Sequence, residues 1–280
     1  MTPWTVRIPY MRLRIYLLVT FAVTWTAWWL VAHMVPHGGS VFADPFIASL
    51  YVLGGLGPTL AAFVAVIATP REGSLSEYRG RLFRWRVHPV WYFVTFLMPP
   101  LVTLALEYVS IWLSPQRLMV PPLEPLARVA VLFPLMIVGG GLEELGWRGV
   151  AQPALEGRLG RILACTIVGV IWAAWHLPLF FINGVPQFGS SIPRFAFDLL
   201  SNAFLLGWLY SNTRSILMCV LFHAANNTSA AMGLGMPDAP PAVVWTVECL
   251  KFALGFVLVR FVCSKTVSEP KRIRLERESL

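Results

Sequence analysis

The sequence is poor in charged residues, and this scarcity excludes most classes of soluble protein. Only 13% of its 280 residues are Asp, Glu, Lys or Arg, whereas 57% are hydrophobic. A soluble globular protein is roughly 25% charged, so this chain has about half the charge that a fold in water normally carries. We therefore predict an integral membrane protein with little mass outside the bilayer.

The chain also has few cysteines and no secretory processing signal. The cysteines show no CxxC spacing and lie in or beside apolar runs, where free cysteine packs as a small hydrophobe. We assign no chemical role to Cys165, Cys219, Cys249 and Cys263. The first apolar run, 15–35, is too long for the core of a signal peptide and lacks a small-residue cleavage site. We expect it to be retained as a membrane span.

Eight apolar segments are long enough to cross a bilayer. A transmembrane helix needs about 20 consecutive, mostly apolar residues. The segments that meet this requirement are 15–35, 47–69, 89–113, 126–146, 161–182, 193–211, 214–235 and 241–262. Short loops join them, and neither an internal repeat nor a soluble domain interrupts them. We predict an all-α fold, a polytopic transmembrane helical bundle of about eight spans, as a single integral membrane domain over residues 1–280.

The distribution of basic residues predicts the orientation of this bundle. The chain has 22 basic and 14 acidic residues. Eighteen of the basic residues fall at the two termini and in alternate loops, three fall on the opposite side, and Lys251 lies inside the last segment. This positive-inside pattern predicts that both termini are cytoplasmic, and it argues for the lipid bilayer and against nucleic acid as the partner.

The second predicted loop interleaves basic and aromatic residues at positions 81–86. Two interpretations stay open. The segment is either an interfacial helix that binds anionic lipid headgroups or an ordinary cytoplasmic loop with its aromatic belt.

Two adjacent carboxylates, Glu143 and Glu144, follow three glycines, 139–141, at the end of a very apolar stretch. A charge near the bilayer centre costs about 2.5–3.5 kcal/mol on insertion scales. On a helix, Glu144 shares a face with Arg148, whereas Glu143 is rotated by about 100° and has Trp147 at i+4. One carboxylate is then neutralised, and the other is free to serve as a general base in a low-dielectric cleft. The alternative is an interfacial acidic pair where the span meets the cytoplasm.

Two further motifs place polar groups at i and i+4 inside apolar segments. The fifth segment contains Trp172-Ala-Ala-Trp-His176, and the seventh contains His223-Ala-Ala-Asn-Asn227. Each motif alone is explained equally well by hydrogen bonds between helices. Together with Glu143 they supply a base, two imidazoles and an amide on three helices, and a His/Asn pair can hold an oxyanion. This combination favours a catalytic site.

Other polar residues inside the segments receive a structural interpretation. Asp198 and Asn202 share a helix face and are expected to hydrogen-bond to neighbouring helices or to line the same cavity. Glu248 and Lys251, at i and i+3, are expected to neutralise each other. Neither pair is assigned to the chemistry.

Three motifs on separate helices, in this order, give the chain a resemblance to a known family. They are Glu143-Glu144-x-x-x-Arg148, Trp172-x-x-x-His176 and His223-x-x-x-Asn227. The chain resembles the CAAX-prenyl-protease and bacteriocin-processing (lysostaphin-resistance-like) family of intramembrane endopeptidases, whose best-described members have eight spans. The resemblance covers residues 125–235, the family's core. Trp172 stands where the second motif usually has Phe, which is a conservative change.

The resemblance implies a role for each motif residue. Glu143 is the expected catalytic carboxylate, and His176 is expected to help it hold and activate a water. His223 and Asn227 are expected to stabilise the tetrahedral oxyanion, for which losing one donor typically reduces the rate by about 10²–10³.

The remaining motif residues are expected to support the site. Glu144 pairs with Arg148 and fixes the end of the helix. The glycines 139–141 let a neighbouring helix or an extended substrate approach the backbone.

Whether a metal takes part stays open at this stage. If zinc is used, Glu143, His176 and His223 are the expected ligands, since carboxylate and imidazole both bind zinc. We prefer a glutamate-activated water, because it suits one unpaired carboxylate with hydrogen-bonding neighbours. The chain has no His-Glu-x-x-His zinc-protease motif. It also lacks the Gly-x-Ser-Gly and Gly-x-Gly-Asp motifs, which disfavours serine and aspartyl intramembrane proteases.

The sequence therefore predicts an intramembrane endopeptidase, a multi-pass protein of the cell membrane whose active site faces the cytoplasm. The expected substrate is a membrane-associated protein or peptide, either a prenylated CAAX protein or a bacteriocin precursor. The competing hypothesis is a non-catalytic membrane scaffold, an immunity factor or a small-solute transporter. That hypothesis makes Glu143, His176 and His223 dispensable.

Overall fold

The computed structural model describes residues 10–113, 126–232 and 240–261, and all regular structure within these ranges is helical. The first range contains α1 (Met11–Met34), α2 (Pro45–Gly55), α3 (Gly57–Ala68), the 3-10 turn η1 (Pro70–Glu72), α4 (Leu75–Leu82) and α5 (Val90–Leu113). The rest contains α6 (Leu126–Val138), the 3-10 turn η3 (Gly141–Glu143), α7 (Glu144–Gly146), the π turn η4 (Trp147–Ala151), α8 (Gln152–Trp175), the 3-10 turn η5 (Leu177–Phe181), α9 (Ile192–Thr213), α10 (Ile216–Ala231) and α11 (Pro241–Phe261). The prediction of an all-helical fold is confirmed.

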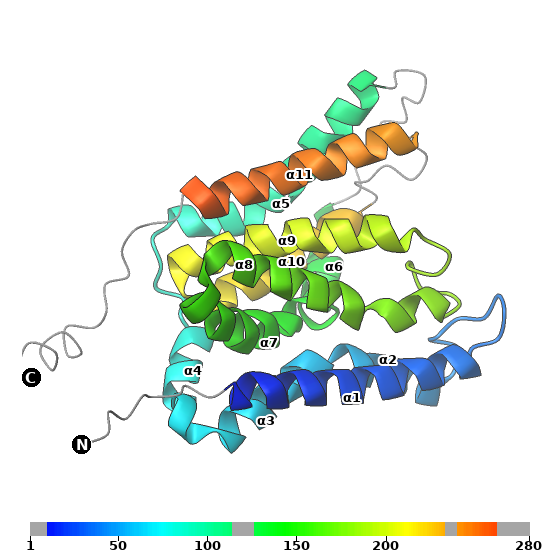
Figure 1. Cartoon of the computed structure of the whole chain (residues 1–280). Helices are drawn as coiled ribbons and strands as arrows, with labels where there is room; N and C mark the ends of the chain where they lie inside the picture. The colour runs from blue at the N-terminus through cyan, green and yellow to red at the C-terminus, as the bar shows by residue number, and fades with distance from the viewer. Residues whose placement is uncertain (1–9, 114–125, 233–239, 262–280) are drawn as a thin grey trace, which may run out of the picture.

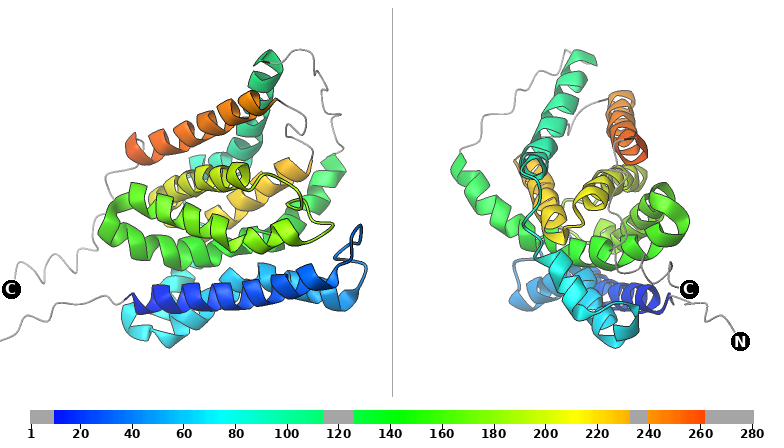
Figure 2. Two further views of the ribbon diagram at one scale, coloured as in Figure 1. Left: turned by 45° about the vertical axis from the view of Figure 1, so that its right-hand side comes forward. Right: turned by 90° about the vertical axis from the view of Figure 1, so that its left-hand side faces the viewer.

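The helices stack as a layered bundle (Figure 1). α1 packs against α2 and α3 at one edge, and α9 packs between α8 and α11. α10 contacts α5, α6 and α9, so it lies inside the bundle. Figure 2 shows the same order from two further directions, with α1 at one edge and α11 at the opposite edge. α1 begins and α11 ends on the same side of the bundle.

Each of the eight predicted segments corresponds to a helix or a pair of helices. Four helical stretches are long and apolar enough to cross a membrane, or five if the bent pair α2–α3 counts as one span. The four are α1, α5, α11 and the stretch Ala127–Phe181. A helical membrane protein is therefore confirmed. The number of eight spans and the cytoplasmic position of the termini stay predictions.

The second predicted segment is bent because of a proline. α2 and α3 meet at an angle of 51° at Leu56. Pro58 has no backbone N–H to bond the carbonyl of Gly54, and its ring clashes with a straight helical path. The hydroxyl of Thr24 on α1 donates to the Gly54 carbonyl instead, at 2.7 Å. The bend is thus stabilised by the helix that packs against it.

The fourth predicted segment, 126–146, is not one helix, and this prediction was wrong. α6 ends at Val138, and the chain then turns through Gly139 and Gly140 before η3 begins. Glycine is the residue that allows such a break, because its backbone is the least restricted. The fifth segment is shorter at its end than expected, since α8 stops at Trp175 and His176 caps it. A second glycine, Gly160, interrupts α8 with a φ of 76° directly before residue 161.

The second predicted loop contains the short helix α4. Ser74 and Glu77 form a capping box at its start, in which each side chain bonds the other residue's backbone. Arg81 donates to the Tyr210 hydroxyl at 2.7 Å and to the Gly149 carbonyl at 3.1 Å. One basic residue of the 81–86 segment therefore ties α4 to the core of the bundle. Whether the others bind headgroups stays open.

The charged residues of α11 form ion pairs with α9, which corrects one prediction. Glu248 and Lys251 on α11 do not pair with each other. Lys251 binds Asp198 on α9 at 2.5 Å, and Arg194 on α9 lies 3.5 Å from Glu248. Both charged side chains of α11 face α9, so each pairs with a residue of α9 and not with the other charged residue of α11. Asn202 and Asp198 do share a face, and the Asn202 amide donates to Asp198 at 3.1 Å.

Some residues used in the sequence predictions lie outside the described residues. The basic residues counted for the predicted orientation that lie outside are Arg7, Arg117, Lys265, Lys271, Arg272, Arg274 and Arg277. Cys263 also lies outside the described residues.

We expect Gly57→Ala to destabilise the contact between α1 and α3. A Cβ at Gly57 would overlap the Thr24 hydroxyl and lie 3.3 Å from the Thr20 carbonyl oxygen. Overpacking of this kind lowers the free energy of unfolding by about 1–3 kcal/mol. Thermal unfolding in detergent should therefore show a lower midpoint. The matched control is Gly55→Ala, whose Cβ would lie 4.0 Å from the Trp28 ring. Equal thermal midpoints for Gly57→Ala and Gly55→Ala would contradict the close packing of α1 against Gly57.

Candidate active site

The paired carboxylates lie where the chain re-enters a helix after the glycine turn. Gly141 begins η3, and a Cβ there would come within 2.8 Å of the Val220 carbonyl oxygen on α10. A Cβ at Gly140 would overlap the amide nitrogen of Asn227 and lie 3.1 Å from Nε2 of His223. The two glycines therefore allow α10 to approach closely. Of the two alternatives that the sequence left open, a neighbouring helix or an extended substrate, the structure shows the helix.

Glu144 binds two partners in the fully buried interior. Its carboxylate lies 2.9 Å from Nη1 of Arg148, and neither side chain is exposed. The same carboxylate lies 2.9 Å from Nδ1 of His223 on α10. Arg148 also donates to the Ala203 carbonyl on α9 at 3.2 Å. The expected ion pair is thus present, and Glu144 in addition connects α7 to α10.

The bond to Glu144 fixes the orientation of the His223 ring. A carboxylate oxygen paired with arginine can only accept a hydrogen bond, so Nδ1 of His223 carries the proton and donates. Nε2 then lies beside Asn227 above Gly140. Nε2, the ring nitrogen that Glu144 does not bind, therefore faces the glycine turn.

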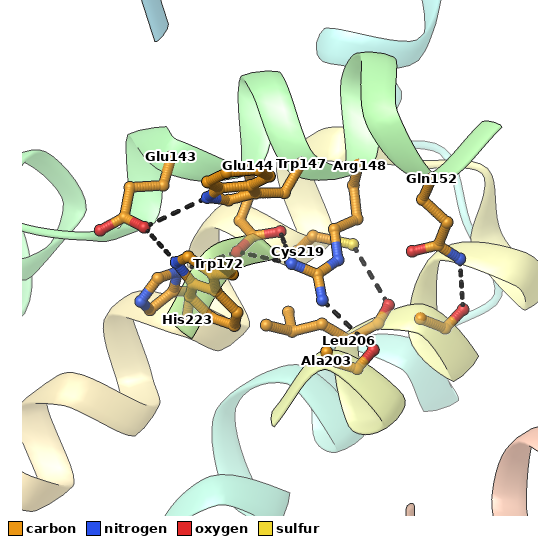
Figure 3. A network of polar contacts seen from close by, with 11 residues as sticks. Glu143, Glu144, Trp147, Arg148, Gln152, Trp172, Ala203, Leu206, Cys219 and His223 are labelled. Atoms are coloured by element: carbon orange, nitrogen blue, oxygen red, sulfur yellow. Dashed lines mark hydrogen bonds and ion pairs between the residues drawn. The ribbon is translucent and has the colours of Figure 1, made fainter. Parts of the chain in front are cut away.

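Glu143 has a different environment from its neighbour (Figure 3). Its Oε2 accepts hydrogen bonds from the indole N–H of Trp172 at 2.6 Å and of Trp147 at 3.3 Å. The side chain is buried, with 8% of its surface exposed. In the part of the chain that the structure describes, Glu143 forms no ion pair, and both of its hydrogen bonds end on Oε2. Glu143 is therefore a buried carboxylate solvated by neutral donors.

His176 caps the C-terminal end of α8 and is held by its own helix. Its Nδ1 lies 2.9 Å from the Trp172 carbonyl oxygen. Because a carbonyl only accepts, Nδ1 donates, and Nε2 of the neutral ring keeps its lone pair. The ring packs edge-on against Phe195 of α9, with centroids 5.1 Å apart. His176 therefore presents an acceptor nitrogen.

Trp172 is the common neighbour of the residues that the sequence singled out. Its indole binds Glu143, and its ring centroid lies 6.1 Å from that of His176 and 5.3 Å from that of His223. Asn227 lies next to His223 above Gly140. The four residues expected to be catalytic thus come together from η3, the end of α8, and α10.

Sequence reasoning missed the two tryptophan donors and the link between Glu144 and His223. Trp172 was noted only as an aromatic residue of a motif, although its N–H was visible in the sequence as a potential donor. The Glu144–His223 bond joins residues 79 apart, and no local pattern could have revealed it. The π turn η4, which carries Trp147 and Arg148, was also not foreseen.

The residues present do not fit a zinc site. Zinc needs at least three protein ligands, which here would be Glu143, His176 and His223. Among the described residues, no group of three or more His, Cys, Asp or Glu side chains is arranged to hold a metal ion.

Comparisons with known proteins point in one direction. Residues 125–229 match the family model described as type II CAAX prenyl endopeptidase Rce1-like. The chain is also 29% identical over 232 residues to a protein of Methanococcus maripaludis named CAAX prenyl protease 2, covering 75% of this chain and 80% of that protein.

These findings confirm the resemblance that the motifs carry. They also confirm the prediction of a peptidase, and with the apolar helices they support an integral membrane protein.

We expect Gly140→Ala to lower the rate of peptide hydrolysis strongly. The added methyl would displace Asn227 and His223 from the glycine turn. Misplacing a reacting group by about 1 Å can reduce a rate by roughly 10²-fold. The measurement is the turnover of a reporter peptide by purified protein in detergent, with the thermal midpoint recorded in parallel.

Gly139→Ala is the neighbouring control for this variant. The only contact of its Cβ within 4 Å, among the described residues, would be the Leu135 carbonyl oxygen at 3.2 Å. This variant should keep most of the activity. Wild-type turnover by Gly140→Ala would show that the close approach of α10 is not needed for hydrolysis.

Proposed function

We propose that this chain is an intramembrane endopeptidase in which Glu143 activates a water for attack on a peptide bond. One observation carries the proposal. Among the described residues Glu143 is a buried carboxylate without an ion pair, and the Trp172 indole that binds it packs beside two imidazoles, each anchored through Nδ1. A scaffold or a transporter does not need this set of groups, whereas hydrolysis by general-base catalysis does.

Activation of the water falls to Glu143 and His176 in this mechanism. Oε1 of Glu143, the oxygen that the indoles leave free, accepts a hydrogen bond from the water. Nε2 of His176 accepts a second hydrogen bond and orients it. As the water oxygen bonds to the scissile carbonyl carbon, its proton passes to Glu143. General-base catalysis of this kind contributes about 10²–10⁴ to the rate.

Stabilisation of the tetrahedral intermediate falls to Asn227 and His223. The Asn227 amide donates to the oxyanion, and Nε2 of His223 donates when the ring is protonated. The carboxylate of Glu144 on the opposite edge of the ring holds the imidazole in this orientation. The carbon–nitrogen bond then breaks, and Glu143 returns its proton to the leaving amine. The products are a new carboxylate and a new amino terminus.

The proposed substrate is a prenylated protein cleaved near its C-terminus. The name of the Methanococcus maripaludis relative and the family description support this choice. A bacteriocin precursor is the alternative from the same resemblance. A panel of otherwise identical peptides with and without a prenyl group distinguishes the two.

The excess of basic residues at the predicted termini and alternate loops supports an active site that faces the cytoplasm.

We expect Glu143→Gln to abolish hydrolysis while the protein stays folded. Gln has the shape of Glu and can still accept an indole bond, but it cannot take the proton of the water. The turnover number should fall by at least about 10²-fold. Turnover is measured with a prenylated reporter peptide, and folding is checked by the thermal midpoint.

Glu77→Gln is the control for this change of charge. Glu77 is an exposed carboxylate of the α4 capping box, where Gln serves equally well. Its turnover should match the wild type. Full activity of Glu143→Gln would instead return the non-catalytic hypothesis or a different base to consideration.

Chelators should not inhibit the enzyme. Because no group of three or more His, Cys, Asp or Glu side chains among the described residues is arranged to hold a metal ion, hydrolysis should continue at an unchanged rate after dialysis against EDTA and in the presence of 1,10-phenanthroline. Metal content of the purified protein is measured alongside. Inhibition that added zinc reverses, with one zinc bound per chain, would establish the metal-dependent alternative.

A further inference from the structure

Trp172 has a larger, bicyclic ring than the Phe usual in its motif, and the N–H of this ring contacts the proposed base. Phe, which the motif usually has, offers an aromatic ring. Trp172 offers a ring and an N–H, and this N–H donates to Oε2 of Glu143 at 2.6 Å. The sequence suggested a conservative change. The contact makes it a change at the centre of the site.

We propose that Trp172 is a positioning residue for Glu143, with Trp147 as the second donor. Both indoles bind Oε2, and this fixes the carboxylate so that Oε1 is the oxygen presented to the water. The inference rests on the proposed function, because it takes Glu143 as the base. It adds that, in this chain, the base is aligned by neutral donors from its own turn and from α8.

A neutral donor suits this task better than a cation. A buried carboxylate needs hydrogen bonds, since an unpaired charge in the interior is very unfavourable. Arginine would meet that need but would pair with the negative charge, as Arg148 does with Glu144. An indole N–H is uncharged and does not give up its proton, so it stabilises the carboxylate and leaves it able to accept a proton.

Trp172 is itself held firmly enough to align another residue. It is buried, with 1% of its surface exposed. The Arg148 guanidinium lies over its ring, 5.3 Å from the centroid, and the rings of Trp147 and His223 pack against it with centroids 6.4 Å and 5.3 Å away. A donor whose own rotamer is locked by packing can hold a catalytic group in a productive geometry.

The decisive variant is Trp172→Phe, which keeps an aromatic ring, although a smaller one, and removes the N–H. We expect the turnover number to fall about 10- to 100-fold, the range for loss of one charge-assisted hydrogen bond, while KM stays within about twofold. KM should hold because Trp172 contacts the base and not the substrate. Turnover and KM are measured with the prenylated reporter peptide.

Trp175→Phe is the matched control from the same helix. Its indole is equally buried and donates at 2.8 Å to the Thr24 hydroxyl, which has no part in the proposed chemistry. Both variants lose one buried indole bond, so both should lose similar thermal stability. Only Trp172→Phe should lose turnover. Equal turnover in the two variants would overturn the inference.

A double-mutant cycle separates this inference from the proposed function. In the Glu143→Gln background there is no base to align, so adding Trp172→Phe should leave the residual rate unchanged. An equal fold-loss in both backgrounds would mean that Trp172 acts through general packing, and would overturn the inference alone. Full activity of Glu143→Gln would overturn the proposed function as well.

A second variant keeps the test decisive if Trp172→Phe does not fold. Trp147→Phe removes the longer bond to the same oxygen, 3.3 Å against 2.6 Å. We expect a smaller loss of turnover, again at constant KM and absent in the Glu143→Gln background. Wild-type turnover for Trp147→Phe would then count against alignment by the indoles.

Discussion

The site depends on the contacts that the buried carboxylate of Glu144 makes with Arg148 and His223. Glu144 binds Arg148 within its own turn and His223 on α10, and Arg148 in turn donates to α9. Removing one partner of a buried pair typically costs about 3–5 kcal/mol, because the other charge stays unpaired in the interior. The ion pair therefore sets the relative position of three helices, and the orientation of His223 follows from it.

Adjacent residues of the same type have acquired different properties through their neighbours. Glu144 faces a guanidinium and an imidazole, and its charge is compensated. Glu143 is one residue earlier, at the end of a 3-10 turn, and its carboxylate accepts hydrogen bonds from two indole N–H groups. The glycine turn makes this division workable, because Gly140 and Gly141 let α10 come near enough to bring His223 and Asn227 to the same place.

The sequence predicted what depends on local chemistry and missed what depends on distant partners. Apolar length revealed the positions of the helices, and the i, i+4 spacing revealed the pair Glu144–Arg148. The break after Val138 was not foreseen, since glycines in membrane helices often leave the helix intact. The bond from Trp172 to Glu143 and the ion pair between Asp198 and Lys251 involve residues 29 and 53 positions apart. Such contacts follow from packing, which spacing along the chain does not encode.

The separation of Glu144 and His223 along the chain has a consequence for biogenesis. Their bond spans 79 residues, so it cannot form before α10 has been synthesised and has packed against α7. Non-local contacts of this kind form late in folding, because the intervening chain must first be ordered. The nascent protein thus holds its carboxylates without the groups that complete the site. In the proposed mechanism, the hydrolase is therefore inactive until its own helical bundle has closed.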